Sequence, residues 1–151
     1  MIEYPDNIEL VLVYQIDKEY YTEKVNAKKI DIFYQILSVP SFAKNLAYGD
    51  IVKVELDEDE YHFEELVKES GHSVIHIVFF NLSDKEEIIT TLEEFGCRVN
   101  TNIADNYLAI DIPPLITYLN IKAYLDKQQM QNILDYSESC LSYFHKEIEN
   151  S

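Results

Sequence analysis

Two short runs of β-branched and aliphatic residues limit most strongly what this chain can fold into. Ile8 to Ile16 reads IELVLVYQI, and Val74 to Phe80 reads VIHIVFF. Nearly continuous apolar runs of this length are typical of strands that are covered on both faces. They are also far shorter than the roughly 20 residues that a helix needs to span a bilayer. The sequence therefore predicts two buried strands and no membrane-embedded segment.

Alternation of apolar and polar residues predicts further strands. A second strand is expected over residues 30–36, and Pro40 should end it because proline cannot donate a ladder hydrogen bond. Asp50 to Lys68 is predicted to form a hairpin with its loop at Asp57 to Glu60. The remaining predicted strands are two short ones, at residues 98–101 and 107–112.

The clearest predicted helix lies in SDKEEIITTLEEFG. Ser83 and Glu86 have the spacing of a capping box, and Gly96 takes the position after the last turn where a positive φ is needed. One apolar stripe is expected on this helix, at Ile88, Ile89, Leu92 and Phe95. The other expected helical segments are a short turn over residues 41–50 closed by Gly49, a helix over about 117–128 after Pro113 and Pro114, and a last helix over about 137–148 presenting Leu141, Phe144 and Ile148.

The order of these elements predicts the fold class. A strand-rich N-terminal half is followed by a half in the order strand, helix, strand, strand, helix, without the regular alternation of a doubly wound sheet. This order indicates a single compact α+β domain over residues 1–151. The length of 151 residues suits one domain, and no internal repeat or linker interrupts it.

The charge of the chain restricts its partners. With 28 Asp plus Glu against 12 Lys plus Arg, the formal net charge is −16. Such a charge repels phosphate backbones and anionic lipids, and it attracts cationic surfaces over a long range. We expect no nucleic-acid or membrane partner and a basic protein as partner. Two cysteines, Cys97 and Cys140, and no leader-like first segment lead us to expect reduced thiols and a cytoplasmic location.

Common cofactor and metal motifs are missing from the sequence. The three glycines form neither a dinucleotide-binding loop nor a P-loop. A calcium loop starting at Asp57 would need glycine at His62 and glutamate at Lys68. His72 and His76 would lie about 13 Å apart on a strand, too far for one metal ion. We therefore predict no cofactor, no metal and no assigned catalytic residue.

The stretch ESGHSVIH, Glu69 to His76, allows two interpretations. In one, Ser70 and Gly71 make a turn into a buried strand, and the side chains of His72 and Ser73 bond to nearby backbone. In the other, a pocket forms where adjacent strands end, because Ser70 and His72 supply a nucleophile and a base. The residues of this possible pocket are Asp50, Ser70, His72, Ser73 and His76.

The acidic run at Asp57 to Glu60 also has a plain and a functional interpretation. It is either a solvated hairpin tip or an anionic surface for a basic partner. The candidate partner-binding residues are Asp57, Glu58, Asp59, Glu60, Tyr61, Glu64 and Glu65. Tyrosine, of which the chain has 12, suits such a surface because it joins a large ring to a hydroxyl.

Several motifs together resemble a bacterial protein family. They are VPSFAKNLAYGDIVKVELDED, ESGHSVIHIVF, LEEFGCRV and AIDIPP with AYLD downstream, spread over about residues 11–126. This pattern is similar to the family known as domain of unknown function 4265, whose most specific positions here lie around Pro40, Gly49 and Ser70 to Ser73. The resemblance implies a bacterial domain with no assigned activity. The family usually carries arginine where this chain has His76.

From these observations we expect an acidic binding protein that engages a basic protein. Its most concrete form is an immunity or antitoxin-type inhibitor that covers the cationic surface of a toxin. The alternatives are a small ligand-binding domain or hydrolase using a pocket near Asp50, Ser70 and His72, and a self-association module. Charge and tyrosine content support the first, and neither identifies the partner or the oligomeric state.

Overall fold

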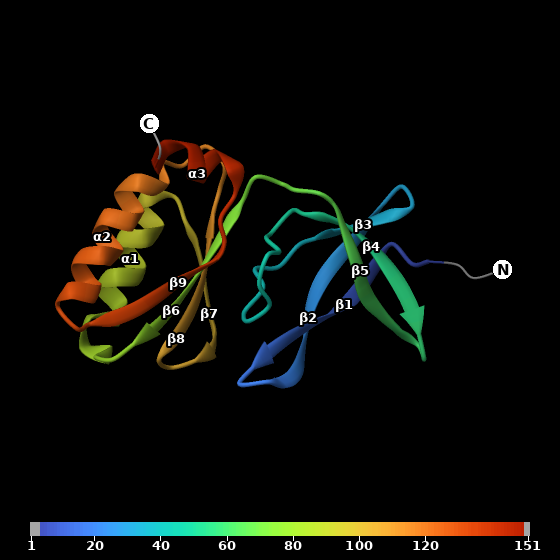
Figure 1. Ribbon diagram of the computed structural model, residues 1–151, viewed down its shortest axis with the longest axis horizontal. Helices are drawn as coiled ribbons and strands as arrows, with labels where there is room; N and C mark the ends of the chain where they lie inside the picture. The colour runs from blue at the N-terminus through green and yellow to red at the C-terminus, as the bar shows by residue number, and fades with distance from the viewer. Residues whose placement is uncertain (1–3, 150–151) are drawn as a thin grey trace.

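The N-terminal half of the protein is a closed barrel. The computed structural model describes residues 4–149, and Figure 1 shows the barrel on one side of it. The strands of the barrel are β1 (Asn7–Ile16), β2 (Glu19–Ile30), β3 (Phe33–Ile36), β4 (Ile51–Asp57) and β5 (Glu60–Lys68). Neighbouring strands are antiparallel, and the parallel pair β1/β5, with Leu10 opposite Tyr61, closes the barrel. Side chains pointing inward from β1 and β2, such as Leu10, Leu12 and Val25, are buried.

The C-terminal half is a four-stranded antiparallel sheet in the order β7-β8-β6-β9. Its elements are β6 (Ser73–Phe79), η1 (Leu82–Asp84), α1 (Lys85–Phe95), β7 (Arg98–Ala104), β8 (Tyr107–Ile112), α2 (Tyr118–Met130), β9 (Leu134–Cys140) and α3 (Tyr143–Glu149). Two β-α-β units, β6-α1-β7 and β8-α2-β9, interleave in this sheet, which is the split arrangement of a ferredoxin-like topology. Helices α1 and α2 lie on one face of the sheet, and the barrel lies beyond the other (Figure 1).

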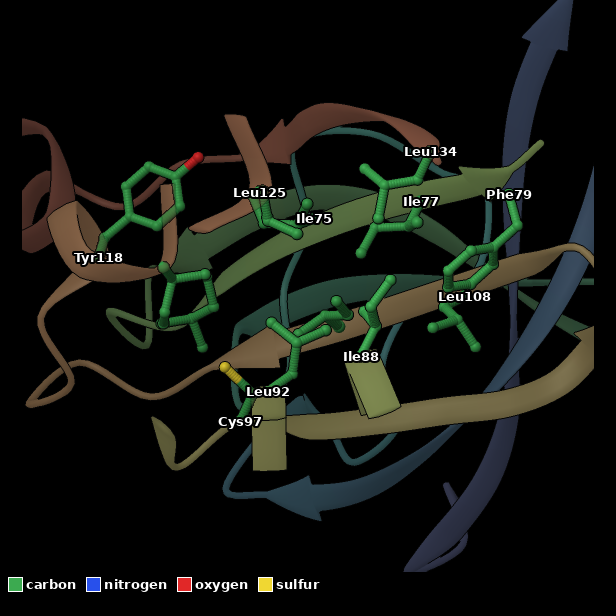
Figure 2. Close-up of a cluster of buried hydrophobic side chains, with 13 residues drawn as sticks. Ile75, Ile77, Phe79, Ile88, Leu92, Cys97, Leu108, Tyr118, Leu125 and Leu134 are labelled. Carbon is green, nitrogen blue, oxygen red and sulfur yellow. The ribbon is translucent and has the colours of Figure 1, made fainter. Parts of the chain in front are cut away.

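Each half has its own hydrophobic core. Figure 2 shows the larger one, in which Ile75 and Ile77 from β6 face Ile88 and Leu92 of α1 and Leu125 of α2. The barrel encloses the second core, which includes Leu10, Tyr34 and Val52. Residues of β6 alternate between the two sides of the sheet, so Val74, His76 and Val78 point toward the barrel. The polar side chains discussed below lie on or near this side.

The α+β class is confirmed, and so are many of the predicted elements. The predicted hairpin is β4–β5, and its tip is the two-residue turn Glu58–Asp59. The helices at 85–95 and 118–130 and the strands at 98–104 and 107–112 also correspond to predictions. Gly96 ends α1 with a φ of +106°, as its position predicts. Ile88 and Leu92 are buried, and Ile89 and Phe95 are partly buried against the same core.

Four predictions about local structure were wrong. One strand was predicted at residues 30–36. Instead, residues 19–30 form the long strand β2, the chain turns at Asp31, and residues 33–36 form β3, which pairs with β2 as a hairpin. Residues 41–50 contain bends and the Gly49 turn but no helix. Residues 137–140 belong to β9 rather than to the last helix, which starts at Tyr143; the side chain of Ile148 lies outside the described part. Ser83 does not cap α1, because it lies inside the 3-10 turn that Asn81 caps, and the N-cap position of α1 is Asp84, whose side chain makes no capping bond.

Candidate functional site

Asp50 and Ser70 fasten two turns together at the end of the barrel. Asp50 is buried, and its carboxylate accepts hydrogen bonds from the backbone N–H groups of Ala47, at 3.0 Å, and Ser70, at 2.9 Å. The Ser70 hydroxyl donates to the carbonyl of Tyr48 at 2.7 Å and accepts from the N–H of His72 at 3.1 Å. Burial raises the pKa of Asp50, although both backbone donors act against this shift. All these polar groups are committed to the turns, so the geometry is that of a structural clasp.

Gly49 makes the close approach of these turns possible. Its φ is +87°, and a Cβ at this position would lie 3.0 Å from the Cβ of Ser70 and 3.6 Å from the ring of His72. A side chain would therefore be strained by the backbone conformation and would also push the Ser70 turn away. The requirement for glycine here follows from packing and needs no ligand.

His72 pairs with a buried acid that the sequence interpretation missed. Nδ1 of His72 lies 2.7 Å from Oδ1 of Asp111, which is fully buried on β8. The ring of Tyr48 lies 5.3 Å from the His72 ring, and the guanidinium of Arg98 lies 4.4 Å above Tyr48. A histidine whose Nδ1 is held by a carboxylate has the orientation of a general base. The hydroxyl of Ser70 is bonded elsewhere, so no serine nucleophile faces this imidazole.

Ser73 faces the helical side of the sheet and takes part in a different network. Its hydroxyl lies 2.5 Å from Nδ1 of His145 and accepts from the N–H of Ser142 at 2.8 Å. Nε2 of His145 lies 3.1–3.2 Å from the carbonyls of Pro113 and Ile116, which can only accept, so this nitrogen carries the proton. Ser73 and His145 are both fully buried. The pair therefore holds α3 against the sheet and is closed to a substrate.

His76 lines a cavity at the junction of barrel and sheet. This junction cavity has a volume of about 350 Å³ and is bounded by side chains that include Tyr14, Phe42, Lys44, His76, Tyr107 and Tyr136. Nε2 of His76 lies 3.0 Å from the carbonyl of Pro40. Burial lowers the pKa of His76, and the electrostatic effect of Lys44 acts in the same direction. None of the other four predicted pocket residues lines this cavity.

The predicted partner-binding residues lie along the β4–β5 hairpin, and their charges are unequally available. Glu60 lies 3.3 Å from Lys24 and 4.0 Å from His62, and Glu64 lies 3.8 Å from Lys53. Within residues 4–149, no ion pair involves Asp57, Glu58, Asp59 or Glu65. The ring of Tyr61 packs 6.4 Å from that of Tyr34 and is half-buried. Of the four hairpin carboxylates without an ion pair, three therefore lie at the turn and Glu65 lies on β5.

The sequence grouped five residues that the structure separates into three places. Asp50, Ser70 and His72 do meet, but Ser73 lies on the opposite face and His76 lies in the junction cavity. Sequence reasoning missed Asp111 and His145, whose roles depend on contacts between distant segments. It also missed Glu23, whose carboxylate accepts hydrogen bonds from the backbone N–H groups of residues 41–43. One signal was available for Asp111, because a carboxylate inside the apolar run YLAIDI must find a partner when the strand is buried.

Other features bear on the chemistry open to the protein. Both cysteines are free thiols, and burial raises the pKa of each to about 12. Among the described residues, no cluster of three His, Cys, Asp or Glu side chains is placed to hold a metal ion. No helix within this part of the chain is long and apolar enough to cross a membrane.

The family model of a domain of unknown function (DUF4265) matches residues 23–136, which include the Asp50 clasp, His72 and Asp111. The chain belongs to this family. A crystal structure of a hypothetical protein from Neisseria gonorrhoeae is similar over 95% of this chain and 99% of that one, with 28% identity and a TM-score of 0.81. No curated protein is significantly similar to the chain.

Proposed function

We propose that this member of DUF4265 is an acidic binding protein that engages a basic protein through the tip of the β4–β5 hairpin. The observation that carries the proposal is the group of carboxylates without ion pairs at Asp57, Glu58 and Asp59, in a chain of net charge −16. A negative patch in a negative overall field attracts a cationic partner and raises its association rate. We extend the binding surface along the strands to Glu60, Tyr61, Glu64 and Glu65.

The shape of the hairpin suits this role. Glu58 and Asp59 have φ values of +48° and +68°, as in the tight turns that match the twist of antiparallel strands. Residues 57–60 are all exposed. Glu60 and Glu64, whose present lysine partners are about half exposed, can exchange them for cations of a partner at little cost.

The finer form of the proposal is an immunity or antitoxin-type inhibitor acting in the cytoplasm. Toxins that act on nucleic acid carry cationic substrate-binding surfaces, and a small acidic protein can cover such a surface with carboxylates. Exposed tyrosines such as Tyr20, which is 74% exposed, add contact area of the kind found at interface hot spots.

The proposal is tested by capturing partners from a lysate of the source organism with three tagged proteins. The first is the wild type, and the second is the hairpin variant Asp57→Asn, Glu58→Gln, Asp59→Asn. The third is a control of equal net charge, Glu87→Gln, Glu93→Gln, Glu94→Gln, whose changes lie on the exposed face of α1. The amides keep side-chain size, and asparagine tolerates the positive φ of residue 59.

The expected result is one basic protein retained by wild type and control at about 0.05 M salt, and lost from the hairpin variant. At about 0.5 M salt its recovery should fall, because the screening length shrinks to a few ångströms. Equal recovery with the hairpin variant and the control would refute the hairpin as the binding surface. An empty capture with all three proteins at both salt concentrations would argue against a basic partner altogether.

A second candidate is a small ligand-binding domain or hydrolase that uses the region of Asp50, Ser70 and His72. The observation in its favour is the 2.7 Å contact between His72 and Asp111, which orients the imidazole as a base. Hydrolysis of p-nitrophenyl acetate by the wild type and His72→Ala tests it. A rate that falls to the buffer background only in the variant, under conditions in which circular dichroism shows the variant to be folded, supports the candidate, and identical rates oppose it.

A further inference from the structure

The junction cavity is a hollow that neither the acidic hairpin nor the Asp50 clasp uses. Its volume of about 350 Å³ falls in the range of small-molecule sites, and it lies where two differently folded halves meet. Barrel strand β1 and the β3–β4 loop form one wall, and the face of the sheet that the helices leave uncovered forms the other. Apolar surface predominates in its lining, with a few polar groups among it.

A row of aromatic rings forms one side of the cavity. The ring of Phe42 stacks on Tyr14 at 5.0 Å and lies 5.1 Å from Tyr107, and Tyr107 lies 5.7 Å from His76. Such a row offers ring faces and edges to a flat aromatic ligand. An aliphatic ligand of equal size would gain only the burial of its surface.

The aromatic row is held in place before any ligand binds. The carboxylate of Glu23 accepts hydrogen bonds from the backbone N–H groups of Ser41, Phe42 and Ala43, at 2.8–3.1 Å. The hydroxyl of Tyr107 donates to the carbonyl of Ser41 at 2.7 Å. These bonds tie the β3–β4 loop to β2 and β8, so little ordering of the wall is required on binding.

His76, which lines the cavity, has one ring nitrogen that no described residue bonds to. Its Nε2 must carry a proton, because the carbonyl of Pro40 can only accept. In the neutral ring Nδ1 is then an acceptor, and no described residue bonds to it. Asp111 Oδ2 is the one side-chain polar atom of the described residues that is both fully buried and unpartnered. Nδ1 of His76 therefore reaches accessible surface, where a donor on a ligand can meet it.

Lys44 supplies a positive charge at the mouth of the cavity. It is exposed, and no carboxylate within residues 4–149 forms an ion pair with it, although the chain has 28 acidic residues. Lys44 is near enough to His76 to influence its protonation. At physiological ionic strength the screening length is about 8 Å, so a bound anion responds mainly to the charges nearest the cavity. Lys44 attracts it, and two carboxylates nearby oppose it. Oδ1 of Asp135, which also lines the cavity, accepts hydrogen bonds from Gln129 and from the N–H of Tyr136. The Glu23 carboxylate is engaged by three backbone N–H groups, so both carboxylates are partly neutralised by donors.

We propose that the junction cavity binds a small aromatic carboxylate that also carries a hydroxyl or N–H donor. The ligand ring lies against Phe42 and Tyr107, its donor bonds to Nδ1 of His76, and its carboxylate pairs with Lys44. This site is separate from the acidic hairpin and does not depend on the partner-binding proposal.

Titration of the ¹⁵N-labelled protein with three related probes, followed by two-dimensional NMR, tests the site. 4-Hydroxybenzoate has the ring, the donor and the charge. 4-Methoxybenzoate lacks the donor, and 4-hydroxybenzamide lacks the charge. We expect saturable shifts at the amides of residues 42–44, 76–78 and 135–137 with 4-hydroxybenzoate. Both other probes should bind about fivefold more weakly, since each loses one polar contact.

Two lysine variants separate a built site from general charge attraction. Lys44→Gln should weaken 4-hydroxybenzoate about fivefold and leave 4-hydroxybenzamide unchanged. Lys28→Gln makes the same charge change on an exposed residue of β2 and should alter neither affinity. Absence of saturable shifts, shifts centred elsewhere, or equal effects of the two variants would each overturn the proposal. A cooperative thermal unfolding transition in Lys44→Gln and in Lys28→Gln shows that both variants are folded.

Discussion

Nδ1 of His72 lies 2.7 Å from Oδ1 of Asp111, and Oδ2 of the same carboxylate is buried without any partner among the described residues. Asp111 is therefore held by a single side chain that comes from 39 positions earlier in the sequence. A buried carboxylate requires compensation, so His72 supports the fold whatever else it does.

Replacement of His72 should destabilise the protein strongly. His72→Ala leaves the Asp111 carboxylate buried and unpaired, and we expect a loss of about 3 kcal/mol in the free energy of unfolding. The double variant His72→Ala, Asp111→Asn should recover part of this loss, because it removes the stranded charge. Urea unfolding at neutral pH measures both. His62→Ala, on a more exposed histidine, is the control, and an equal effect of both single variants would contradict the role of Asp111.

Ser73 should also matter for stability and not for binding. Ser73→Ala leaves Nδ1 of His145 and the N–H of Ser142 with fewer partners in a buried position. We expect a loss of about 1–3 kcal/mol in the free energy of unfolding. Hydrogen exchange of the α3 amides should become faster in the variant. Unchanged stability would show that water or a rearranged Ser142 satisfies His145.

Stability should decline as the solution is acidified below the ordinary histidine pKa of 6.5. Burial lowers the pKa of His76 and of His145, so the unfolded chain takes up protons first as the pH falls. Their stabilising contribution is thus present above pH 6.5 and lost below it, by at most about 1.4 kcal/mol per histidine per pH unit. Glu23 and the carbonyl of Pro40 oppose the shift at His76, and Lys44 adds to it.

Comparison of the wild type with His145→Gln at pH 7.5 and 5.5 isolates one of these groups. Around His145 the carbonyls of Pro113 and Ile116 and the charge of Asp111 favour protonation, and His72 opposes it. The variant should lose less stability on acidification than the wild type. If the free energy of unfolding of the wild type were higher at pH 5.5 than at pH 7.5, the predicted direction of the pH dependence would be wrong.

Glu23 should control the order of the aromatic row beside the junction cavity. Glu23→Ala removes the acceptor for three backbone N–H groups, and we expect a loss of about 2 kcal/mol in the free energy of unfolding. Exchange of the Phe42 and Ala43 amides should accelerate by at least tenfold, by the same reasoning. Glu9→Ala, on the exposed side of β1, is the matched control. Equal exchange in both variants would show that Glu23 does not hold the loop.

The elements that could be predicted from the sequence are those whose hydrophobic pattern is contained within a single short segment. The alternation in β4–β5, the buried run of β6 and the stripe and Gly96 of α1 are visible in short windows of sequence. Strand β2 could not be predicted in this way, because only two of its residues, Val25 and Ala27, lie in the core and its sequence, EYYTEKVNAKKI, is otherwise mostly polar. Strand β9 could not be predicted either, because the side that faces the barrel carries Ser137 and Ser139, which suit a polar junction between the two halves.

The site was less predictable than the fold for a physical reason. Ser73 and His145 are 72 positions apart, and His76 meets the carbonyl of Pro40 across 36. Spacing within ESGHSVIH could group its serines and histidines, but the pleat of β6 sends Ser73 and His76 to opposite faces. The alternation of a strand was enough to separate those two, whereas the partners Asp111 and His145 required the topology of the sheet.

The most direct test of the proposed function is the association rate of the captured basic protein, measured over a range of ionic strength. The wild type should associate at least tenfold faster at about 0.05 M than at about 0.5 M salt. The hairpin variant Asp57→Asn, Glu58→Gln, Asp59→Asn should be slow throughout, and the α1 control should follow the wild type. Identical rates for the hairpin variant and the control would contradict binding through the hairpin.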